Sequence, residues 1–512
     1  MGSQRMLGFE GIENPIKVSI KQFYGIEIND FAVAVAKTAL WIAEEQLMDI
    51  TQDLIAITLD FLPLTSNDNI HQGNALRINW EEVLPASECS YIIGNPPFVG
   101  SAMRTKEQTE DMEYAFKAEK KWGKCDYCVA WFKKAADYME GQTVKAALVA
   151  TNSIAQGEQV EPTWKRLFDK GIIINFAYES FIWNSQSNEQ AHVHCIIVGF
   201  SYSRESESYL YNEEECRAVN NINGYLIDAK SIFLPTRTPA IDNKHKSIIK
   251  GSQPVDAGGL ILTPQEYEEF VSTYPDLAFL IKEYIGAEEY LKNKKRYCFW
   301  LKNVEPCIWA DNPVIQKRLH IVKEMREASP TKEFRNFASK PHLFVQDRKP
   351  EVDYLLISRV SSSRREYIPV GYVSKNIVPS DSTYIIPDAS LYDFGLVLSC
   401  MHNAWMRIVA GRLKSDYRYS PVVYNTFMYP DPTPDERTAI ETCAQAVLDA
   451  RAEYPHKSLA KLYDPDTMPQ NLLAAHLALD AAVEAAYHVC FNGNEEAIVA
   501  HLFKLYAQAV GE

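Results

Sequence analysis

The feature that most constrains the fold of this chain is the alternation of short apolar runs with amphipathic helical stretches over roughly the first 200 residues. Strand-like runs are predicted at residues 22–28, 91–93, 146–150, 172–177 and 194–200, with helical stretches between several of them. After the first run, Asn29 and Asp30 are helix-capping candidates, and a helix is predicted to extend to about Met48. Strands that alternate with helices indicate a mostly parallel, doubly wound α/β sheet, in which ligands bind at the carboxyl ends of the strands.

An acidic side chain lies at the end of the first predicted strand. Glu27, which is followed by Ile28, stands where a carboxylate can accept two hydrogen bonds from a ribose diol. Acidic residues at such positions are also common as solvated side chains or as helix caps. Glu27 alone therefore leaves both interpretations open.

A more specific feature follows the strand predicted at 91–93, where the chain reads Asn95, Pro96, Pro97, Phe98. The side-chain carbonyl of Asn95 and the backbone carbonyl of Pro96 can accept the two N–H groups of an exocyclic amine, which favours the pyramidal, nucleophilic nitrogen. The prolines hold these acceptors rigid, and Phe98 offers an aromatic face for a base taken out of a duplex. The alternative is a proline-rich turn; the strand context and the aromatic ring favour the chemical interpretation.

The segment 95–98 resembles the catalytic motif of amino-methyltransferases that use S-adenosylmethionine, as in DNA adenine-N6 enzymes. The runs 23–28 and 73–76 resemble the motifs that hold the ribose and the adenine of that cofactor. The resemblance assigns the following residues to the cofactor: Glu27, Ile28, Asn74, Ala75 and Asn95. Position 74 is usually Asp in this family, so Asn74 is a departure from the pattern.

The resemblance also implies the reaction, which is direct transfer of a methyl group to the N6 atom of a flipped adenine without a covalent enzyme intermediate. Asn95, Pro96, Pro97 and Phe98 would form the catalytic loop. The loop by itself leaves cytosine N4 open as the target, whereas Phe98 and the resemblance favour adenine.

One part of the family pattern has no match in this sequence. These enzymes carry a strand, a glycine-rich loop and a helix ahead of the ribose-binding strand, and nothing ahead of Glu27 matches that element. We expect either an N-terminally truncated chain or a second polypeptide that supplies the missing piece, and we favour truncation. Methylation by this chain alone is therefore doubtful.

From about residue 341 the chain becomes strand-like and basic, with strands predicted at 344–348, 354–360, 367–373 and 383–386 and a helix at 395–409. The decapeptide 411–420 follows. If it is extended, alternation places Arg412, Lys414, Asp416 and Arg418 on one face, which could read base edges in a major groove. A solvated charged strand edge is an equally good interpretation of this spacing.

The ranges 341–430 and 462–486 resemble the MmeI-like family of single-chain type II restriction–modification enzymes, which methylate one adenine in an asymmetric site. In that family, the positions of Lys414 and Asp416 read the base beside the methylated adenine. Lysine suits the acceptors of guanine and aspartate suits the amine of cytosine, so we predict guanine next to the target adenine. Weaker candidates for base reading are Arg418, Arg359, Asp381 and Ser382, and candidates for phosphate contacts are Arg364, Arg365 and Lys375. The nuclease of the family has no counterpart in this sequence, so cleavage is not expected.

The resemblance and the patterning together predict four regions: a partial, Rossmann-like methyltransferase domain at 1–205, a linker or spacer at 206–340, a mixed α+β target-recognition domain at 341–430, and a helical C-terminal region at 431–512. The C-terminal region shows amphipathic helices and no catalytic residues.

Composition restricts the possible partners, the localisation and the metal content less strongly than these motifs do. The net charge of −15 in 512 residues argues against a polyanionic partner, but basic residues gather from 348 to 418, and DNA responds to local patches. No run is long and apolar enough for a membrane helix, and no signal peptide begins the chain, so we expect a cytoplasmic protein without a membrane partner. Cys125 and Cys128 have CxxC spacing but no second ligand pair, which favours structural cysteines over a metal site.

The leading prediction is therefore a site-specific DNA adenine-N6 methyltransferase of a restriction–modification system, with double-stranded DNA as its partner. The alternative is a DNA-binding specificity module without catalysis of its own. A third possibility is methylation of a protein glutamine or an RNA base, against which the large basic recognition region argues.

Overall fold

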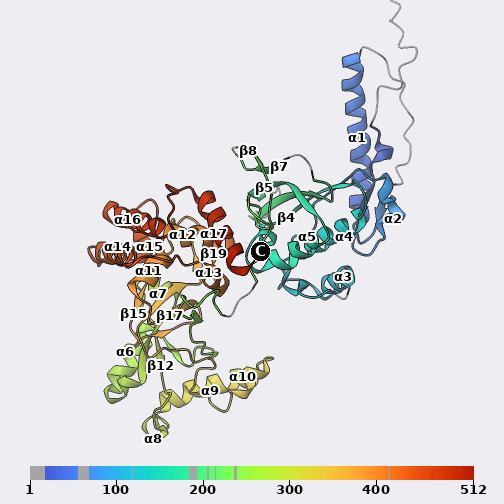
Figure 1. Cartoon of the computed structure of the whole chain (residues 1–512). Coiled ribbons are helices and arrows are strands. Elements are labelled where there is room, and N and C mark those ends of the chain that lie inside the picture. Colours follow the sequence, from blue (N-terminus) through green and yellow to red (C-terminus); the bar gives the residue numbers. More distant parts are fainter. Residues whose placement is uncertain are drawn as a thin grey trace, which may run out of the picture. The chain divides into compact units, whose positions relative to one another are not determined.

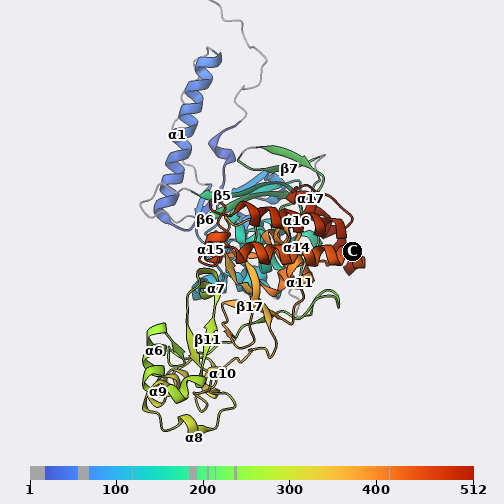
Figure 2. The same cartoon turned by 90° about the vertical axis from the view of Figure 1, so that its left-hand side faces the viewer.

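A computed structural model describes residues 18–55, 69–117, 119–183, 193–204, 207–213, 215–235, 239–413 and 415–511 of the chain. The chain forms two compact units (Figure 1, Figure 2). The first consists of Met1–Thr151, Arg166–Glu179 and Cys195–Cys216, and the second of Asn152–Lys165, Ser180–His194 and Arg217–Glu512. Within the described segments, no helix is both long and apolar enough to cross a bilayer.

Two sheets belong mainly to the first unit. A short one pairs β1 (Gly25–Glu27) in parallel with β2 (Ile70–Gln72). The larger one has the strand order β3-β4-β6-β5-β7-β8. Its strands are β3 (Tyr91–Gly94), β4 (Lys145–Thr151), β5 (Ile173–Trp183), β6 (Val193–Ser201), β7 (Ser208–Tyr211) and β8 (Cys216–Val219). All five strands predicted in this region are present. The larger sheet is mixed, because β3 is parallel to β4 but β4 is antiparallel to β6.

The helices of the first unit are α1 (Asp30–Ile55), α2 (Trp80–Val83), α3 (Lys106–Phe116), α4 (Val129–Met139) and α5 (Arg166–Asp169). The side chain of Asn29 accepts a hydrogen bond from Ala32 N at 3.1 Å, which caps α1 as predicted. Helix α4 packs against β4 and is largely buried, and Phe132 stacks on Phe200 with ring centroids 5.4 Å apart. Cys125 and Cys128 lie buried just before it, and neither forms a disulfide within the described part of the chain.

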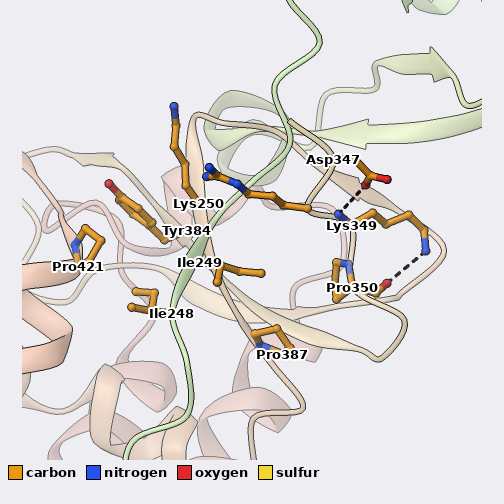
Figure 3. Close-up of a pocket in the computed structure, with 10 residues that line it drawn as sticks. Ile248, Ile249, Lys250, Asp347, Lys349, Pro350, Tyr384, Pro387 and Pro421 are labelled. Atoms are coloured by element: carbon orange, nitrogen blue, oxygen red, sulfur yellow. Dashed lines mark hydrogen bonds between the residues drawn. The ribbon is translucent and has the colours of Figure 1, made fainter. Parts of the chain in front are cut away.

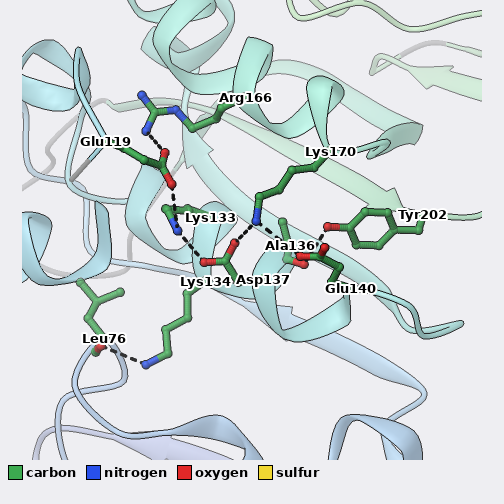
Figure 4. A network of polar contacts seen from close by, with 10 residues as sticks. All are labelled: Leu76, Glu119, Lys133, Lys134, Ala136, Asp137, Glu140, Arg166, Lys170 and Tyr202. Atoms are coloured by element: carbon green, nitrogen blue, oxygen red, sulfur yellow. Dashed lines mark hydrogen bonds and ion pairs between the residues drawn. The ribbon is translucent and has the colours of Figure 1, made fainter. Parts of the chain in front are cut away.

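A polar network holds α4 against its neighbours (Figure 4). The buried ammonium group of Lys133 lies 2.5 Å from Asp137 and 3.4 Å from Glu119, and Arg166 bonds the other oxygen of Glu119 at 2.8 Å. Lys170 bonds Asp137 at 2.6 Å. Burial opposes ionisation of Asp137, but the two lysines outweigh it and lower its pKa. The network therefore ties α4 to Glu119 and Lys170, which lie outside that helix.

The second unit has three further sheets. Their orders are β10-β12-β11-β16, β15-β13-β17-β9 and β14-β19-β18. The bounds are β9 Ile249–Lys250, β10 Ile261–Leu262, β11 Ile281–Ile285, β12 Tyr297–Phe299, β13 Tyr354–Ser358, β14 Val360–Ser361, β15 Val370–Val373, β16 Val378–Pro379, β17 Thr383–Pro387, β18 Gly411–Leu413 and β19 Asp416–Arg418. The run predicted as a strand at 344–348 forms only an isolated bridge at Gln346, whereas the other predicted strands are present.

Most of the interval 206–340, predicted as a linker, is folded. It contains α6 (Pro264–Thr273), α7 (Ala287–Lys292), α8 (Pro306–Trp309), α9 (Pro313–Glu327) and α10 (Lys332–Asn336). Apolar side chains such as Phe270, Trp309 and Val322 share one core, so the interval buries enough surface to fold. Arg326 is fully buried on α9 and donates hydrogen bonds to five backbone carbonyl groups, which fastens the loops at 254–255 and 337–343 to that helix.

The remaining helices are α11 (Leu391–Leu398), α12 (Cys400–Val409), α13 (Pro421–Thr426), α14 (Pro434–Ala452), α15 (Leu459–Leu462), α16 (Gln470–Ala486) and α17 (Glu495–Val510). The single helix predicted at 395–409 is divided at Ser399, whose extended backbone ends α11 and whose hydroxyl caps α12. Helix α14 packs against α16, and α12 packs against α17, so the C-terminal region is helical as predicted.

Candidate active site and nucleic-acid interface

The predicted catalytic loop leaves the carboxyl end of β3. Gly94 is paired with Leu148 of the parallel strand β4, and the next residue, Asn95, is exposed. Pro96 is buried and Phe98 is half-buried, so the loop is anchored through Pro96. The amide of Asn95 makes no hydrogen bond to another described residue. Its carbonyl oxygen is therefore available to accept a hydrogen bond from a ligand.

The far end of the loop is tied to the start of α4. The backbone N–H of Tyr127 donates to the carbonyl of Val99 at 2.9 Å, and the hydroxyl of Thr151 donates to Asp126 at 2.7 Å. Thr151 ends β4, the neighbour of β3. The loop is thus braced by two elements besides its own prolines, which preorganises the acceptors on Asn95 and Pro96.

Four of the five predicted cofactor residues, Glu27, Ile28, Asn74 and Ala75, lie at or after the ends of β1 and β2, whereas Asn95 follows β3. Glu27 is opposite Gln72 in the parallel pair, and the carbonyl of Glu27 accepts a hydrogen bond from Gly73 N at 2.8 Å. One carboxylate oxygen of Glu27 accepts from Asn29 N at 2.9 Å, so it also helps to cap α1. Glu27 and Asn74 are half-buried, whereas Ile28 is 66% exposed. Glu27 can therefore act as a helix cap and also bind a ribose diol, because its second carboxylate oxygen remains available to a ligand.

The buried carboxylate of Asp111 explains why position 74 carries Asn, where the family pattern usually has Asp. The amide group of Asn74 donates to Asp111 at 2.8 Å, Tyr127 OH donates to the same oxygen at 2.7 Å, and Arg77 Nε donates to the other oxygen at 2.6 Å. Burial opposes ionisation of Asp111, but these donors outweigh it and lower its pKa. An Asp at position 74 would place a second carboxylate against Asp111, whereas Asn supplies the donor that this site needs.

This network also joins the residues after β2 to the loop after β3. Tyr127 bonds Asp111 through its hydroxyl and Val99 through its backbone N–H, so two side chains connect Asn74 to the catalytic loop. Lys134 of α4 donates to the carbonyl of Leu76 at 2.9 Å, and burial lowers its pKa to about 8. Asp111 was not predicted, because it lies in a strongly charged helix where nothing in the sequence distinguishes it from solvated carboxylates.

The decapeptide 411–420 is a hairpin in the second unit. Leu413 pairs with Asp416, and Arg412 pairs with Tyr417. The prediction that Arg412 and Asp416 share a face is therefore wrong, because cross-strand partners share a face, so Asp416 lies with Leu413 and Arg412 lies with Tyr417 on the opposite face. Lys414, one of the two predicted base-reading residues, lies outside the described residues.

The guanidinium group of Arg412 is folded onto its own hairpin. It lies 4.1 Å from the centroid of the Tyr417 ring and donates to the carbonyl of Ser415 at 2.9 Å. Arg418, on the other face, is exposed, and Asp416 accepts a long hydrogen bond of 3.4 Å from Ser363 N. Arg418 is thus more available to a ligand than Arg412.

The other three base-reading candidates are neighbours. Arg359 donates from its backbone to Ser382 O at 3.1 Å and from its side chain to Asp381 O at 2.9 Å. Tyr419 N donates to Arg359 O at 2.9 Å, which links this group to the hairpin. The hydroxyl of Ser382 accepts from Ala287 N at 3.0 Å, so it is already engaged within the protein.

A basic cavity of about 690 Å³ lies nearby in the same unit and was not predicted (Figure 3). Its lining includes Lys250, Arg348, Lys349 and Tyr384, and Lys250 lies 3.3 Å from Asp381.

The candidates for phosphate contacts differ in their availability, because Lys375 is exposed whereas Arg364 forms an ion pair with Asp466 at 2.5 Å.

The sequence matches three family models that together cover nearly the whole chain. They are described as the DNA-methyltransferase domain of MmeI over residues 3–212, the target recognition domain of MmeI over 228–431, and the C-terminal domain of MmeI over 432–512. The fold and the site therefore define a chain of the DNA-methyltransferase class that carries a target-recognition domain.

Two relatives identify the family. DNA methyltransferase A of Bacillus subtilis (strain 168) is 40% identical over 496 residues, which are 96% of this chain and 56% of that protein. A solved structure of the type IIL restriction-modification enzyme MmeI in complex with DNA is 39% identical, with a TM-score of 0.88 over 97% of this chain and 67% of that one. The chain belongs to the MmeI family, and it spans little more than half of the length of its Bacillus relative.

Proposed function

We propose that this chain is the catalytic and DNA-reading part of a site-specific DNA methyltransferase of a restriction–modification system, which modifies the N6 atom of adenine. The observation that carries the proposal is the braced loop at the end of β3. On it, an exposed Asn95 keeps its side-chain acceptor free beside the carbonyl of the buried Pro96. Within the second unit, the domain limits proposed are 341–430 for target recognition and 431–512 for the helical region.

The residues at the ends of β1 and β2 fit the adenosine half of S-adenosylmethionine. Glu27 offers a carboxylate oxygen that is available to a ribose diol, and Asn74 is held in place by Asp111. When bound, S-adenosylmethionine supplies an electrophilic methyl group. The described residues provide no comparable wall for its methionine half, so we propose that an additional polypeptide segment completes the site.

The residues of the chain then have distinct tasks. Asn95 Oδ1 and Pro96 O accept the two N–H groups of the target amine, which concentrates electron density in the nitrogen lone pair. Phe98 stacks on the extruded base and keeps it out of the duplex. The bracing of the loop by Tyr127 and Thr151 reduces the motion of these acceptors, so less entropy is lost when the base binds.

The second unit would choose the sequence that is modified. We propose that Lys414, Asp416 and Arg418 read base edges from the hairpin, with guanine beside the target adenine. Arg359, Asp381 and Ser382 are weaker candidates for reading other bases, and Lys375 contacts the phosphate backbone.

The test is a calorimetric titration of the chain with S-adenosylmethionine, with and without duplex DNA, followed by a methylation assay with the completing segment added. We expect methylation of adenine that falls at least about a hundredfold in Asn95→Ala, because the loss of one preorganised acceptor has effects of this size. The matched control is Asn376→Ala, an exposed asparagine in the second unit. Equal activity of Asn95→Ala and wild type would contradict the proposal.

A second candidate function is sequence-specific DNA binding without catalysis. The observation in its favour is that Tyr91 and Ile93, directly before the catalytic loop, are 71% and 81% exposed, so this side of the active site is open. Salt-dependent, sequence-specific duplex binding with no cofactor binding under any condition would support it.

A further inference from the structure

A short segment of the second unit begins directly at the end of β4. Thr151, the last residue of β4, belongs to the first unit, and the next residues, Asn152–Lys165, belong to the second. Trp164 holds this segment together, because its ring is fully buried and its Nε1 atom donates to the carbonyl of Ile154 at 2.9 Å. The segment starts next to the residue whose hydroxyl braces the catalytic loop.

Gly157 of this segment lies against the hairpin 411–418 within the second unit. Its φ is +55°, and a Cβ atom at this position would be 2.9 Å from the backbone nitrogen of Gly411 and 3.0 Å from its Cα. Such distances are shorter than van der Waals contact, and backbone atoms cannot turn away as a flexible side chain can. Position 157 therefore requires glycine both for its positive φ and for the space that it leaves to the hairpin.

The contact is made at the strand of the hairpin that has fewer neighbours. In the sheet β14-β19-β18, β19 pairs on both edges, whereas β18 pairs only with β19 among the described strands. Gly411 is the first residue of β18 and follows Ala410, the residue at which α12 ends. Since no second described strand holds β18, its start is positioned by α12 and by Gly157.

Two buried polar atoms lie next to this contact in sequence. Oε1 of Gln156, the residue before Gly157, and Nε of Arg412, the residue after Gly411, are both buried without a hydrogen-bond partner among the described residues. Folded proteins rarely leave buried polar atoms unpaired, because each loses its hydrogen bonds to water. These two exceptions need an explanation other than stability, which indicates a functional role for the place where the segment meets the hairpin.

We propose that Gly157 is a positioning residue for sequence recognition. Its contact with Gly411 sets the place of the hairpin 411–418, and therefore of Asp416 and Arg418, relative to the rest of the second unit. Hydrogen bonds to base edges require close and well-aligned partners, so a small displacement of the hairpin weakens base reading. The inference rests on the proposed function and deepens it, because it names a residue that determines specificity through the hairpin, without a base contact of its own.

The experiment measures sequence preference through binding alone. The full chain is equilibrated with DNA duplexes that carry a randomised central stretch, and the bound fraction is sequenced. Asp416→Ala identifies the base pair that the hairpin reads, because the preference is lost there. Gly157→Ala should lower the preference at the same base pair about tenfold and leave the rest of the selected sequence unchanged.

The matched control is Gly493→Ala in the same unit. Its φ is +79°, so alanine strains the backbone there as well, but no described atom beyond its neighbours in the chain lies within 4 Å of the Cβ position. The sequence preference of this variant should equal that of the wild type.

An unchanged preference in Gly157→Ala would overturn the inference, as would an equal loss in Gly493→Ala or a loss at a base pair that Asp416→Ala does not affect. A merely structural role of Gly157 predicts weaker binding of all duplexes with the same selected sequence, and circular dichroism detects unfolding. If Gly157→Ala does not fold, Gly157→Asn takes its place, since asparagine tolerates a positive φ and still adds the Cβ atom.

The same experiment separates this inference from the proposed function. A wild-type chain that selects no sequence contradicts the proposed DNA reading and the inference with it. A chain that selects a sequence and responds to Gly157→Ala as expected, but does not methylate DNA, leaves the inference standing and contradicts only the proposed catalysis.

Discussion

Two strands of nearly the same composition have opposite environments in this protein. Tyr354–Ser358 forms β13 of the second unit, where residues 354–357 are at most 1% exposed, whereas Tyr91 and Ile93 of β3 are 71% and 81% exposed. β13 has hydrogen-bonded neighbours on both edges, β15 and β17, and β3 has one described neighbour. An apolar run therefore indicates a strand, but the neighbours decide whether its side chains are buried.

The largest expected effect tests this comparison directly. Leu356→Ala in β13 should lower the free energy of unfolding by about 2–5 kcal/mol, because it leaves a cavity in a closed core. Ile93→Ala in β3 should change it by less than about 0.5 kcal/mol, because the side chain is in water in both states. Urea denaturation of both variants measures this. A cost above about 2 kcal/mol for Ile93→Ala would break the comparison, since it would mean that the face is covered.

The two units also hold buried carboxylates of opposite behaviour. Burial raises the pKa of Asp480 in α16 to about 6, although hydrogen bonds from Tyr367 and Cys400 oppose the shift. A raised folded-state pKa gives stability that is present below about pH 4 and is lost as the pH rises to about 6, on the order of 1–3 kcal/mol. Asp480→Asn should therefore gain stability relative to wild type between pH 4 and pH 7. Thermal unfolding at several pH values measures this. A stability difference between the two proteins that does not change with pH would contradict the raised pKa of Asp480.

In the first unit, the donors around Asp111 should make Asn74→Asp unfavourable. We expect a loss of about 1–2 kcal/mol at pH 7, because a hydrogen bond is replaced by the repulsion of two carboxylates. The loss should shrink as the pH falls, because a proton shared between the two groups restores a hydrogen bond. Asn376→Asp, at an exposed site, is the control in the same denaturation series. Equal behaviour of the two variants would show that Asp111 does not need a donor at position 74.

The smallest effects are expected at the proposed DNA backbone contacts of the second unit. Lys375→Ala should lower the dependence of duplex affinity on salt, reducing the slope of log K against log salt concentration by about 1. Arg364→Ala should change the slope less, because Asp466 already pairs with its guanidinium group. Fluorescence anisotropy at several salt concentrations distinguishes them. An equal change of slope would mean that DNA replaces Asp466 as the partner of Arg364.

Much of the fold followed from local patterns. The strands predicted around Glu27 and ahead of Asn95, and the amphipathic C-terminal helices, are present because strand and helix periodicities are local properties of the chain. The interval 206–340 was misjudged, since its proline and glycine residues suggested a linker while its core is assembled from distant apolar side chains. The face predicted for Arg412 was wrong because Leu413 pairs in antiparallel with Asp416, which places Arg412 on the opposite face from Asp416.

The sequence by itself determined which residues lie at strand ends and which chemistry we propose for the segment 95–98, because both depend on neighbours along the chain. Only the tertiary structure decided that Asp111 requires a donor at position 74, that Arg359 lies beside Asp381, and that β3 keeps an uncovered face. These facts depend on residues that are distant in sequence. Hydrogen-bond partners, burial and free strand edges arise only when such residues come together in space.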